Sequence, residues 1–257
     1  MERVTGRRQV GLARALSKLG FCSRSQAAKL IREGRVLLNG ATRRDPETPV
    51  RMERDHIEVD RNTVTAESRI YMVLNKPRGV VTTASDEKGR QTVYSLLDEK
   101  LPWLGPVGRL DKASEGLLLL TNDSEWAARI SDPGSHLDKT YHVQVGALAG
   151  ETLADQLVRG VFAGGEQLCA KRARVLRTGE KNTWLEIVLD EGKNREIRRM
   201  LEHLEIEVLR LIRVAIGPLA LGQLAKGQSR ALVAPEKFAL EAAIKISLGK
   251  TRISEKG

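Results

Sequence analysis

Four consecutive leucines, Leu117–Leu120, constrain this chain most, because such a run predicts a strand that is buried on both faces. A short polar turn precedes the strand and holds one carboxylate, Asp111, two residues after Arg109. Gly108 and Gly116 bracket the turn, so its backbone can bend without a side-chain clash. An ionised acid beside a core strand is costly unless a partner stabilises it, so the turn is a candidate site for chemistry. From spacing alone, a solvated turn residue or a helix cap is the commoner role for such an acid.

The charge of the chain predicts a polyanionic partner. Its 257 residues include 43 Lys and Arg against 33 Asp and Glu, a net charge of +10. This balance favours nucleic acid or an acidic membrane surface as the partner. The first 35 residues hold nine basic and two acidic side chains, so the positive charge is concentrated at the N-terminus.

The cysteines and the hydropathy pattern predict a cytoplasmic protein. Cys22 and Cys169 are far apart and have no CxxC partner, which argues against a disulfide framework and against structural zinc. The sequence shows neither an apolar signal-peptide core nor an apolar stretch of membrane-spanning length. We therefore expect no membrane association.

The first sixty residues predict a small module of two helices and a sheet. Leucine spacing predicts a helix over 8–20, and Ser23 with Gln26 forms a capping-box pattern that opens a second helix ending at Gly34. Asn39-Gly40 is the strongest two-residue hairpin signal. Six basic side chains lie on the polar helix faces or just beyond them, with few acids between them, and are candidate phosphate contacts: Arg14, Lys18, Arg24, Lys29, Arg32 and Arg35. A solvated basic face is the alternative.

From residue 70 onward the pattern predicts a sheet with helices packed against it, an α+β arrangement. The predicted strands are 70–74, 117–120, 141–145, 184–189 and 208–214. The predicted helices are 151–158, 195–204 and 236–246, with a further helix capped by Ser124.

Two segments around the turn resemble a family signature. Gly108-Arg109-Leu110-Asp111, followed by the segment 116–123, resembles the motif of pseudouridine synthases of the branch that modifies bacterial ribosomal RNA. In that family the acid of this motif is the essential catalytic residue, so the resemblance assigns catalysis to Asp111. Three further segments match the family's other motifs: Asn75–Gly79, Lys139–Val143 and Glu191–Leu201.

The resemblance also implies the residues that support the acid. Tyr141 would line the site and pack on the target base, although its position alone suits a half-buried packing residue. Arg198 would pair with Asp111 and hold it ionised, since a bidentate guanidinium favours the charged carboxylate. A surface pair between Arg198 and Glu202 is the alternative for that arginine.

Lys76 and Arg109 complete the expected site. Lys76 follows the first strand of this region and would either reach a phosphate or hold the Asp111 loop, while an ordinary Pro-Gly turn with an exposed lysine is the alternative. Arg109 belongs to the acid's own motif. Glu115 and Glu196 are among the positions that depart from the family pattern, and neither replaces a residue of the expected site.

The basic N-terminal segment has a resemblance of its own. Leu12 to Gly40 is similar to the S-four-like RNA-binding module of ribosomal proteins, which docks on structured RNA by shape and phosphate contacts. The two resemblances together imply an α+β protein of two domains. A small αα-plus-sheet RNA-binding module would span 8–66, and a pseudouridine synthase domain with a mixed, largely antiparallel sheet flanked by helices would span 69–248.

The implied function is the isomerisation of a specific uridine to pseudouridine in ribosomal RNA, with 23S rRNA favoured over the small-subunit RNA. The expected partner is ribosomal RNA, free or in assembling subunits, with no obligatory protein partner and a monomeric chain. We expect no cofactor and no metal, because the four histidines show no ligand spacing and the chain lacks a complete phosphate loop. The alternative is a non-catalytic ribosome-assembly protein with the same fold.

Overall fold

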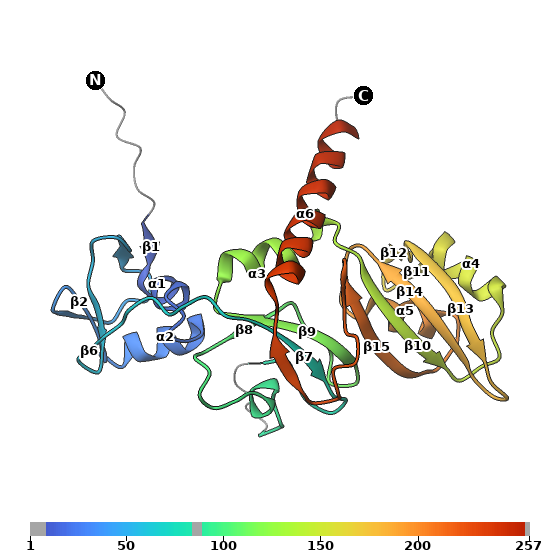
Figure 1. Ribbon diagram of the computed structural model, residues 1–257, viewed down its shortest axis with the longest axis horizontal. Helices are drawn as coiled ribbons and strands as arrows, with labels where there is room; N and C mark the ends of the chain where they lie inside the picture. The colour runs from blue at the N-terminus through green and yellow to red at the C-terminus, as the bar shows by residue number, and fades with distance from the viewer. Residues whose placement is uncertain (1–8, 84–88, 255–257) are drawn as a thin grey trace. The chain divides into compact units, whose positions relative to one another are not determined.

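The computed structural model describes residues 9–83 and 89–254, with side chains up to residue 244 (Figure 1). The chain divides into two compact units. One joins Met1–Tyr71 with Asp98–Gly105 and Leu120–Glu125, and the other joins Met72–Leu97, Pro106–Leu119 and Trp126–Gly257. No described helix has the length and apolar character needed to cross a membrane.

Two short helices form the centre of the first unit, as the sequence predicted. Helix α1 (Leu12–Lys18) begins later than expected, because the preceding strand β1 (Val10–Gly11) pairs with β4 (Pro49–Val50). The predicted capping box of α2 (Arg24–Arg32) is confirmed, since the Ser23 hydroxyl accepts the Gln26 N–H at 3.1 Å. The apolar faces of both helices pack into one core with the small sheet.

The small sheet has the strand order β3-β2-β5-β6, and every neighbouring pair is antiparallel. The predicted Asn39-Gly40 hairpin joins its first two strands. The strands are β2 (Val36–Leu38), β3 (Ala41–Arg43), β5 (Ile57–Val59) and β6 (Asn62–Thr63).

A mixed sheet organises the second unit, in the order β13-β14-β10-β15-β9-β7-β17. Strands β15 and β9 run parallel, whereas β13–β14, β14–β10, β10–β15 and β7–β17 are antiparallel. The strands on this path are β7 (Tyr71–Lys76), β9 (Glu115–Thr121), β10 (Lys139–Val145), β13 (Arg172–Thr178), β14 (Thr183–Leu189), β15 (Val208–Ile216) and β17 (Ser229–Ala231). Two short strands lie off the path, β8 (Gly105–Val107) and β16 (Leu219–Ala220).

The leucine run forms the buried strand that the sequence predicted. All seven residues of β9 are buried, and Leu117–Leu120 have no exposed surface. Gly116 is required there, because its φ is +101° and a side-chain carbon would collide with the carbonyl of Arg213 on β15. The turn that carries Asp111 therefore enters the sheet at a fixed point.

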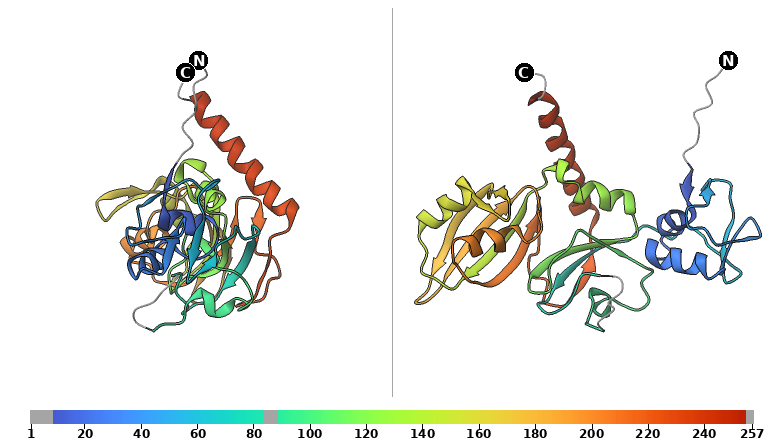
Figure 2. Two further views of the ribbon diagram at one scale, coloured as in Figure 1. Left: turned by 90° about the vertical axis from the view of Figure 1, so that its left-hand side faces the viewer. Right: turned by 180° about the vertical axis from the view of Figure 1, so that it is seen from behind.

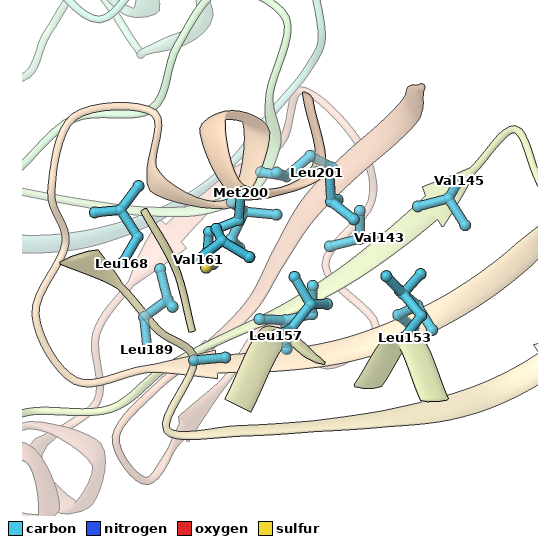
Figure 3. Close-up of a cluster of buried hydrophobic side chains, with 14 of the residues drawn as sticks. Val143, Val145, Leu153, Leu157, Val161, Leu168, Leu189, Met200 and Leu201 are labelled. Atoms are coloured by element: carbon cyan, nitrogen blue, oxygen red, sulfur yellow. The ribbon is translucent and has the colours of Figure 1, made fainter. Parts of the chain in front are cut away.

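One face of the sheet packs on the main apolar cluster, which Figure 3 shows in close-up. Helices α4 (Glu151–Arg159) and α5 (Glu196–His203) and the hairpin of β11 (Val161–Ala163) and β12 (Glu166–Leu168) contribute to this cluster. The two views from opposite sides show both helices on the same side of the strands (Figure 2). Arg199 ties the hairpin to α5, donating to Glu166 at 2.7 Å and to the carbonyl of Ala163 at 2.6 Å.

Two details of the sequence prediction were wrong. Asp123, not Ser124, caps helix α3 (Ser124–Ser131), because its carboxylate accepts the Glu125 N–H at 3.2 Å. Strand β13 was not predicted, because a bulge between Val175 and Arg177 breaks the alternation of polar and apolar residues that begins at Arg172. The last helix, α6 (Ala234–Ser254), begins close to the predicted position and continues further. Two 3-10 turns, Val93–Leu96 and Pro133–Ser135, complete the described elements.

Candidate active site

The loop between β8 and β9 is held rigidly by hydrogen bonds to its backbone. Each of the five carbonyls from residue 110 to residue 114 accepts at least one. The Thr82 hydroxyl donates to the carbonyl of Leu110 at 2.8 Å, and the Gly79 N–H donates to the carbonyl of Lys112 at 2.7 Å. A backbone with this many fixed carbonyls holds Asp111, its central acid, in one place.

Lys76 is the main donor to this loop. Its ammonium donates to the carbonyls of Asp111 at 3.1 Å, Ser114 at 2.9 Å and Pro77 at 3.0 Å, and the residue has no exposed surface. Burial lowers the pKa of Lys76 to about 8, against the opposing effect of the nearby carboxylates Asp111 and Glu115. The sequence left two roles open for Lys76, which were to reach a phosphate or to hold the Asp111 loop. These contacts support the second role, since a buried ammonium cannot reach a phosphate in solvent.

Asp111 itself is accessible, with 38 % of its side chain exposed. The sequence predicted that Arg198 pairs with this acid, and the structure places Arg195 there instead. Arg195 Nη1 lies 3.8 Å from Asp111 Oδ2, which is at the long end for an ion pair. Arg195 precedes the first turn of α5 in a left-handed conformation, with φ +50°. This conformation could not be predicted from helix periodicity, because few residues other than glycine adopt it.

Arg198 supports the loop rather than the carboxylate. Its Nη2 donates to the carbonyl of Ala113 at 3.0 Å, so neither the expected pair with Asp111 nor the alternative pair with Glu202 forms among the described residues. Burial lowers the pKa of Arg198, and the neighbouring cations Arg195 and Arg78 add to this while Asp111 opposes it. Arg195 and Arg198 thus lie close to one acid, and Arg78 lies close to Arg198, a density of positive charge suited to an anionic substrate.

A cavity of about 250 Å³ opens beside this acid. Tyr141 of β10 lines it, half-buried against the main apolar cluster, as expected for a ring that packs on a planar base. Arg109 also lines the cavity and is exposed, whereas Lys76 lies behind the loop. Apolar side chains complete the wall: Leu110, Leu189, Ile197 and Leu211.

A second carboxylate, Glu196, lines the same cavity but is buried. Its Oε2 accepts the Lys193 N–H at 3.1 Å, and burial raises the pKa of Glu196 despite that bond. Glu196 therefore holds the segment that leads into α5, and Asp111 is the carboxylate in this cavity that is open to a ligand.

The six basic side chains predicted to bind RNA differ in how free their charges are. Arg14, Arg24 and Arg32 are exposed, and within the described chain no carboxylate pairs with them. Lys18 pairs with Glu125 at 2.6 Å, and Arg35 makes two hydrogen bonds to Asp60 that raise its pKa. Lys29 lies 3.9 Å from Glu33. Arg14, Arg24 and Arg32 are therefore the better candidates for phosphate contacts.

Across residues 9–83 and 89–254, the structure brings no three His, Cys, Asp or Glu side chains together in a way that would hold a metal ion. The charged and aromatic lining of the cavity consists of two carboxylates, three arginines, a lysine and a tyrosine.

Comparison with known proteins decides the family. Residues 70–203 match the family model for RNA pseudouridylate synthases, and residues 10–66 match that of the S4 domain. The chain belongs to the RNA pseudouridylate synthase family. It is therefore a pseudouridine synthase with an N-terminal S4 domain. The family's motif acid and tyrosine line one cavity in this synthase.

Similar proteins match the synthase over most of its length. It is 35 % identical over 233 residues to ribosomal large subunit pseudouridine synthase B of Bacillus subtilis, covering 90 % of this chain and 95 % of that protein. A protein of Rickettsia prowazekii named as an RNA pseudouridine synthase is 38 % identical over 222 residues, covering 84 % and 91 %. A crystal structure of a pseudouridylate synthase matches with a TM-score of 0.63 and 32 % identity, covering 90 % of this chain and 99 % of that one.

Sequence reasoning missed one site residue, Arg195, and one cation near Arg198, which is Arg78. Arg195 stands three positions before Arg198 in the same motif, a spacing at which side chains on a helix are neighbours. That spacing was the available signal. Arg78 follows Pro77 in the first motif, and nothing in its local sequence separates it from an ordinary exposed arginine.

Proposed function

We propose that this synthase converts a specific uridine of 23S ribosomal RNA to pseudouridine, with Asp111 as the catalytic residue and without a cofactor. The observation that carries the proposal is the position of Asp111: a half-exposed carboxylate on a rigid loop, at the mouth of a cavity of about 250 Å³. The choice of 23S RNA is supported by the name of the Bacillus subtilis relative, ribosomal large subunit pseudouridine synthase B.

In this proposal Asp111 acts on the nucleotide in one of two ways. It attacks the sugar as a nucleophile, or it removes a ribose proton as a base. Both routes break the bond between the sugar C1′ and uracil N1. The uracil then rotates and its C5 bonds to C1′, while C5 loses a proton and N1 gains one. This step releases the carboxylate in the first route, and the ribose proton returns to the sugar in the second. The reaction is an isomerisation, so atoms and electrons balance without a co-reactant. Arg195, 3.8 Å from the carboxylate, supplies positive charge beside it in either route.

The remaining site residues are proposed to bind and hold the nucleotide. A base inside folded RNA is out of reach of a cavity, so the uridine is expected to flip out of its helix. Tyr141 would pack on the flipped base against the apolar wall, and Arg109 with Arg78 would hold the flanking phosphates at the exposed rim. Lys76 and Arg198 would act indirectly, through the backbone of the Asp111 loop.

The S4 domain would position the enzyme on ribosomal RNA, free or in an assembling subunit, through its unpaired arginines. We expect the enzyme to act as a monomer in the cytoplasm. Mapping pseudouridines by carbodiimide-dependent reverse-transcription stops, in cells with and without the gene, tests which ribosomal RNA is the substrate. Loss of a stop in 23S RNA alone is expected, and loss in the small-subunit RNA alone would contradict the proposed substrate.

Asp111→Asn tests the catalytic assignment, because the amide keeps the size of the carboxylate. Single-turnover assays at saturating enzyme should detect no pseudouridine formation, while the dissociation constant for the RNA stays within about threefold of wild type. Appreciable turnover by this variant would refute the role of Asp111. Glu196→Gln serves as a matched carboxylate control, and we expect it to keep turnover.

A further inference from the structure

The sheet of the second unit has an outer face that the active site does not use. Along β14, Leu185 and Ile187 point into the main apolar cluster, so the alternating Trp184 and Glu186 point to the other side. Helices α4 and α5 lie on the inner side (Figures 1 and 2). Tyr141, which lines the cavity, packs against the same apolar cluster.

Four outer-face residues form a row across four neighbouring strands. Strand register places Arg177 of β13 opposite Trp184, Trp184 opposite Gln144 of β10, and Gln144 opposite Arg210 of β15. Three strand spacings of about 4.8 Å make this row about 14 Å wide. We call these four residues the Arg–Trp row.

The tryptophan holds both arginines of the row. The guanidinium carbons of Arg177 and Arg210 lie 5.4 Å and 5.6 Å from the centre of the Trp184 ring, within the range of a cation–π contact. Arg210 is held a second time, by hydrogen bonds of 3.2 Å to both oxygens of Glu115. Side chains that are fixed before binding lose less conformational entropy when a ligand arrives.

The charges around the row are arranged with cations outside and acids beneath them. Arg174 and Lys226 are 64 % and 54 % exposed, whereas their carboxylate partners Glu186 and Glu115 are 23 % and 4 % exposed. Burial raises the pKa of Glu115, but the bonds from Arg210 and Lys226 outweigh this and hold the pKa below its usual value. The face therefore carries four cations, Arg177 and Arg210 included, over two carboxylates.

Part of this arrangement contributes little to folding. An exposed ion pair such as that of Arg174 with Glu186 stabilises a protein by about 0–1 kcal/mol, and the exposed Arg177 beside Trp184 adds no buried core. Arg210 and Lys226 differ, because they also pair with the buried Glu115. The same arrangement suits a phosphodiester backbone, because arginine combines ring stacking with bidentate pairing to phosphate.

We propose that the Arg–Trp row is the centre of an additional RNA-docking surface, which binds the backbone of a segment flanking the uridine that enters the cavity. This proposal rests on the proposed function only for the identity of the RNA. Single-stranded and duplex RNA present the same phosphates. The surface would therefore recognise the negative charge of the phosphodiester backbone in either kind of segment.

Two double variants of the full chain, with equal loss of charge, test the surface. Arg177→Gln/Arg210→Gln removes both arginines of the row, and Arg129→Gln/Arg159→Gln removes two exposed arginines of α3 and α4. Binding of polyuridylate and of a transcribed 23S RNA fragment is measured between 50 and 200 mM salt. The slope of log K against log salt should fall by at least about 0.7–0.9, the value for one phosphate contact, in the first variant. Arg177 is free of carboxylates among the described residues, whereas Arg210 is already paired with Glu115. The slope should change much less in the control, whose two arginines lie beside carboxylates.

Trp184→Leu tests whether the ring contacts of Arg177 and Arg210 matter for RNA binding, or only their positive charge. The variant removes the ring and keeps every charge. We expect its affinity for both RNAs to fall several-fold at one salt concentration with a nearly unchanged slope. Equal slopes in the two double variants would overturn the proposal, and an acidic protein would then be the better candidate partner for this face. Because polyuridylate is not ribosomal RNA, its binding tests the surface even if 23S RNA is not the substrate.

Turnover distinguishes a failure of this surface from a failure of the proposed function. No residue of the row lines the cavity, so Arg177→Gln/Arg210→Gln should react at the wild-type rate once enzyme saturates the RNA. Asp111→Asn has the opposite signature, normal binding without turnover.

Discussion

Lys76 places an ammonium where water cannot reach it, and every hydrogen bond that it makes goes to a backbone carbonyl. Such a group costs folding free energy in its charged form, which is why burial lowers its pKa from 10.5 to about 8. The unfolded chain keeps the proton up to a pH near 10.5, and the folded chain releases it near 8. Folding stability attributable to Lys76 therefore rises with pH between 8 and 10.5 and is absent below pH 8.

We predict that this pH dependence is lost in Lys76→Met. Urea unfolding of both proteins at pH 7.5 and pH 10 should show the wild type gaining stability relative to the variant at the higher pH. The gain should be at most about 3 kcal/mol, from 1.36 kcal/mol for each unit of pKa shift. A stability difference that does not change with pH would mean that folded Lys76 keeps its proton at both pH values, so that burial does not lower its pKa.

The two arginines nearest the acid differ in what their side chains do, so their lysine variants should differ too. Arg195 supplies charge at 3.8 Å, which lysine can replace, whereas Arg198 uses a guanidinium N–H to hold the Ala113 carbonyl. We expect Arg195→Ala and Arg198→Ala each to slow single turnover at least about tenfold, equivalent to 1.4 kcal/mol. Arg195→Lys should recover more of the rate than Arg198→Lys, and the reverse order would favour a direct pair between Arg198 and Asp111.

At the scale of elements, the cap of α3 shows what a buried carboxylate contributes to a helix start. Asp123 accepts the Glu125 N–H, the Tyr71 hydroxyl at 2.9 Å and Arg69 at 3.0 Å, and it is almost fully buried. Asp123→Ala should cost about 1–2 kcal/mol of stability, as for other capping residues. Ser124→Ala should cost under about 0.5 kcal/mol. Chemical denaturation of the two variants measures both values, and equal losses would show that Asp123 is not the cap.

Sequence patterns predicted the elements whose signals are local. The Leu117–Leu120 strand, the Ser23 capping box and the Asn39-Gly40 hairpin each depend on a few adjacent residues, and each is confirmed. The partner of Asp111 was predicted wrongly because the left-handed backbone at Arg195 decides which arginine reaches the acid. Strand β13 was missed because a bulge breaks its alternation of polar and apolar residues, and the place of a bulge is a property of the sheet and not of the segment. The domain limits 8–66 and 69–248 stay a prediction.

At the scale of the whole molecule, the surplus of positive charge is distributed over surfaces in both units. Residues 1–66 hold 14 basic and 8 acidic side chains, and the rest hold 29 and 25. Formal charge does not measure the capacity to bind phosphate, because Lys18 and Arg35 are already paired with carboxylates. Counting unpaired and exposed cations is the better guide, and it selects the S4 domain's free arginines.

A pair of double variants in the S4 domain tests this distinction. Arg14→Gln/Arg24→Gln and Lys18→Gln/Arg35→Gln each remove two charges from the full chain. Only the first pair consists of exposed arginines that are free of carboxylates among the described residues. We expect the first variant to lower the salt slope of RNA binding by about 1.4–1.8. The second should lower it far less, because Glu125 and Asp60 already neutralise those cations. Similar slopes in the two variants would show that an RNA phosphate displaces these carboxylates, so that pairing in the free protein does not determine which cations bind RNA.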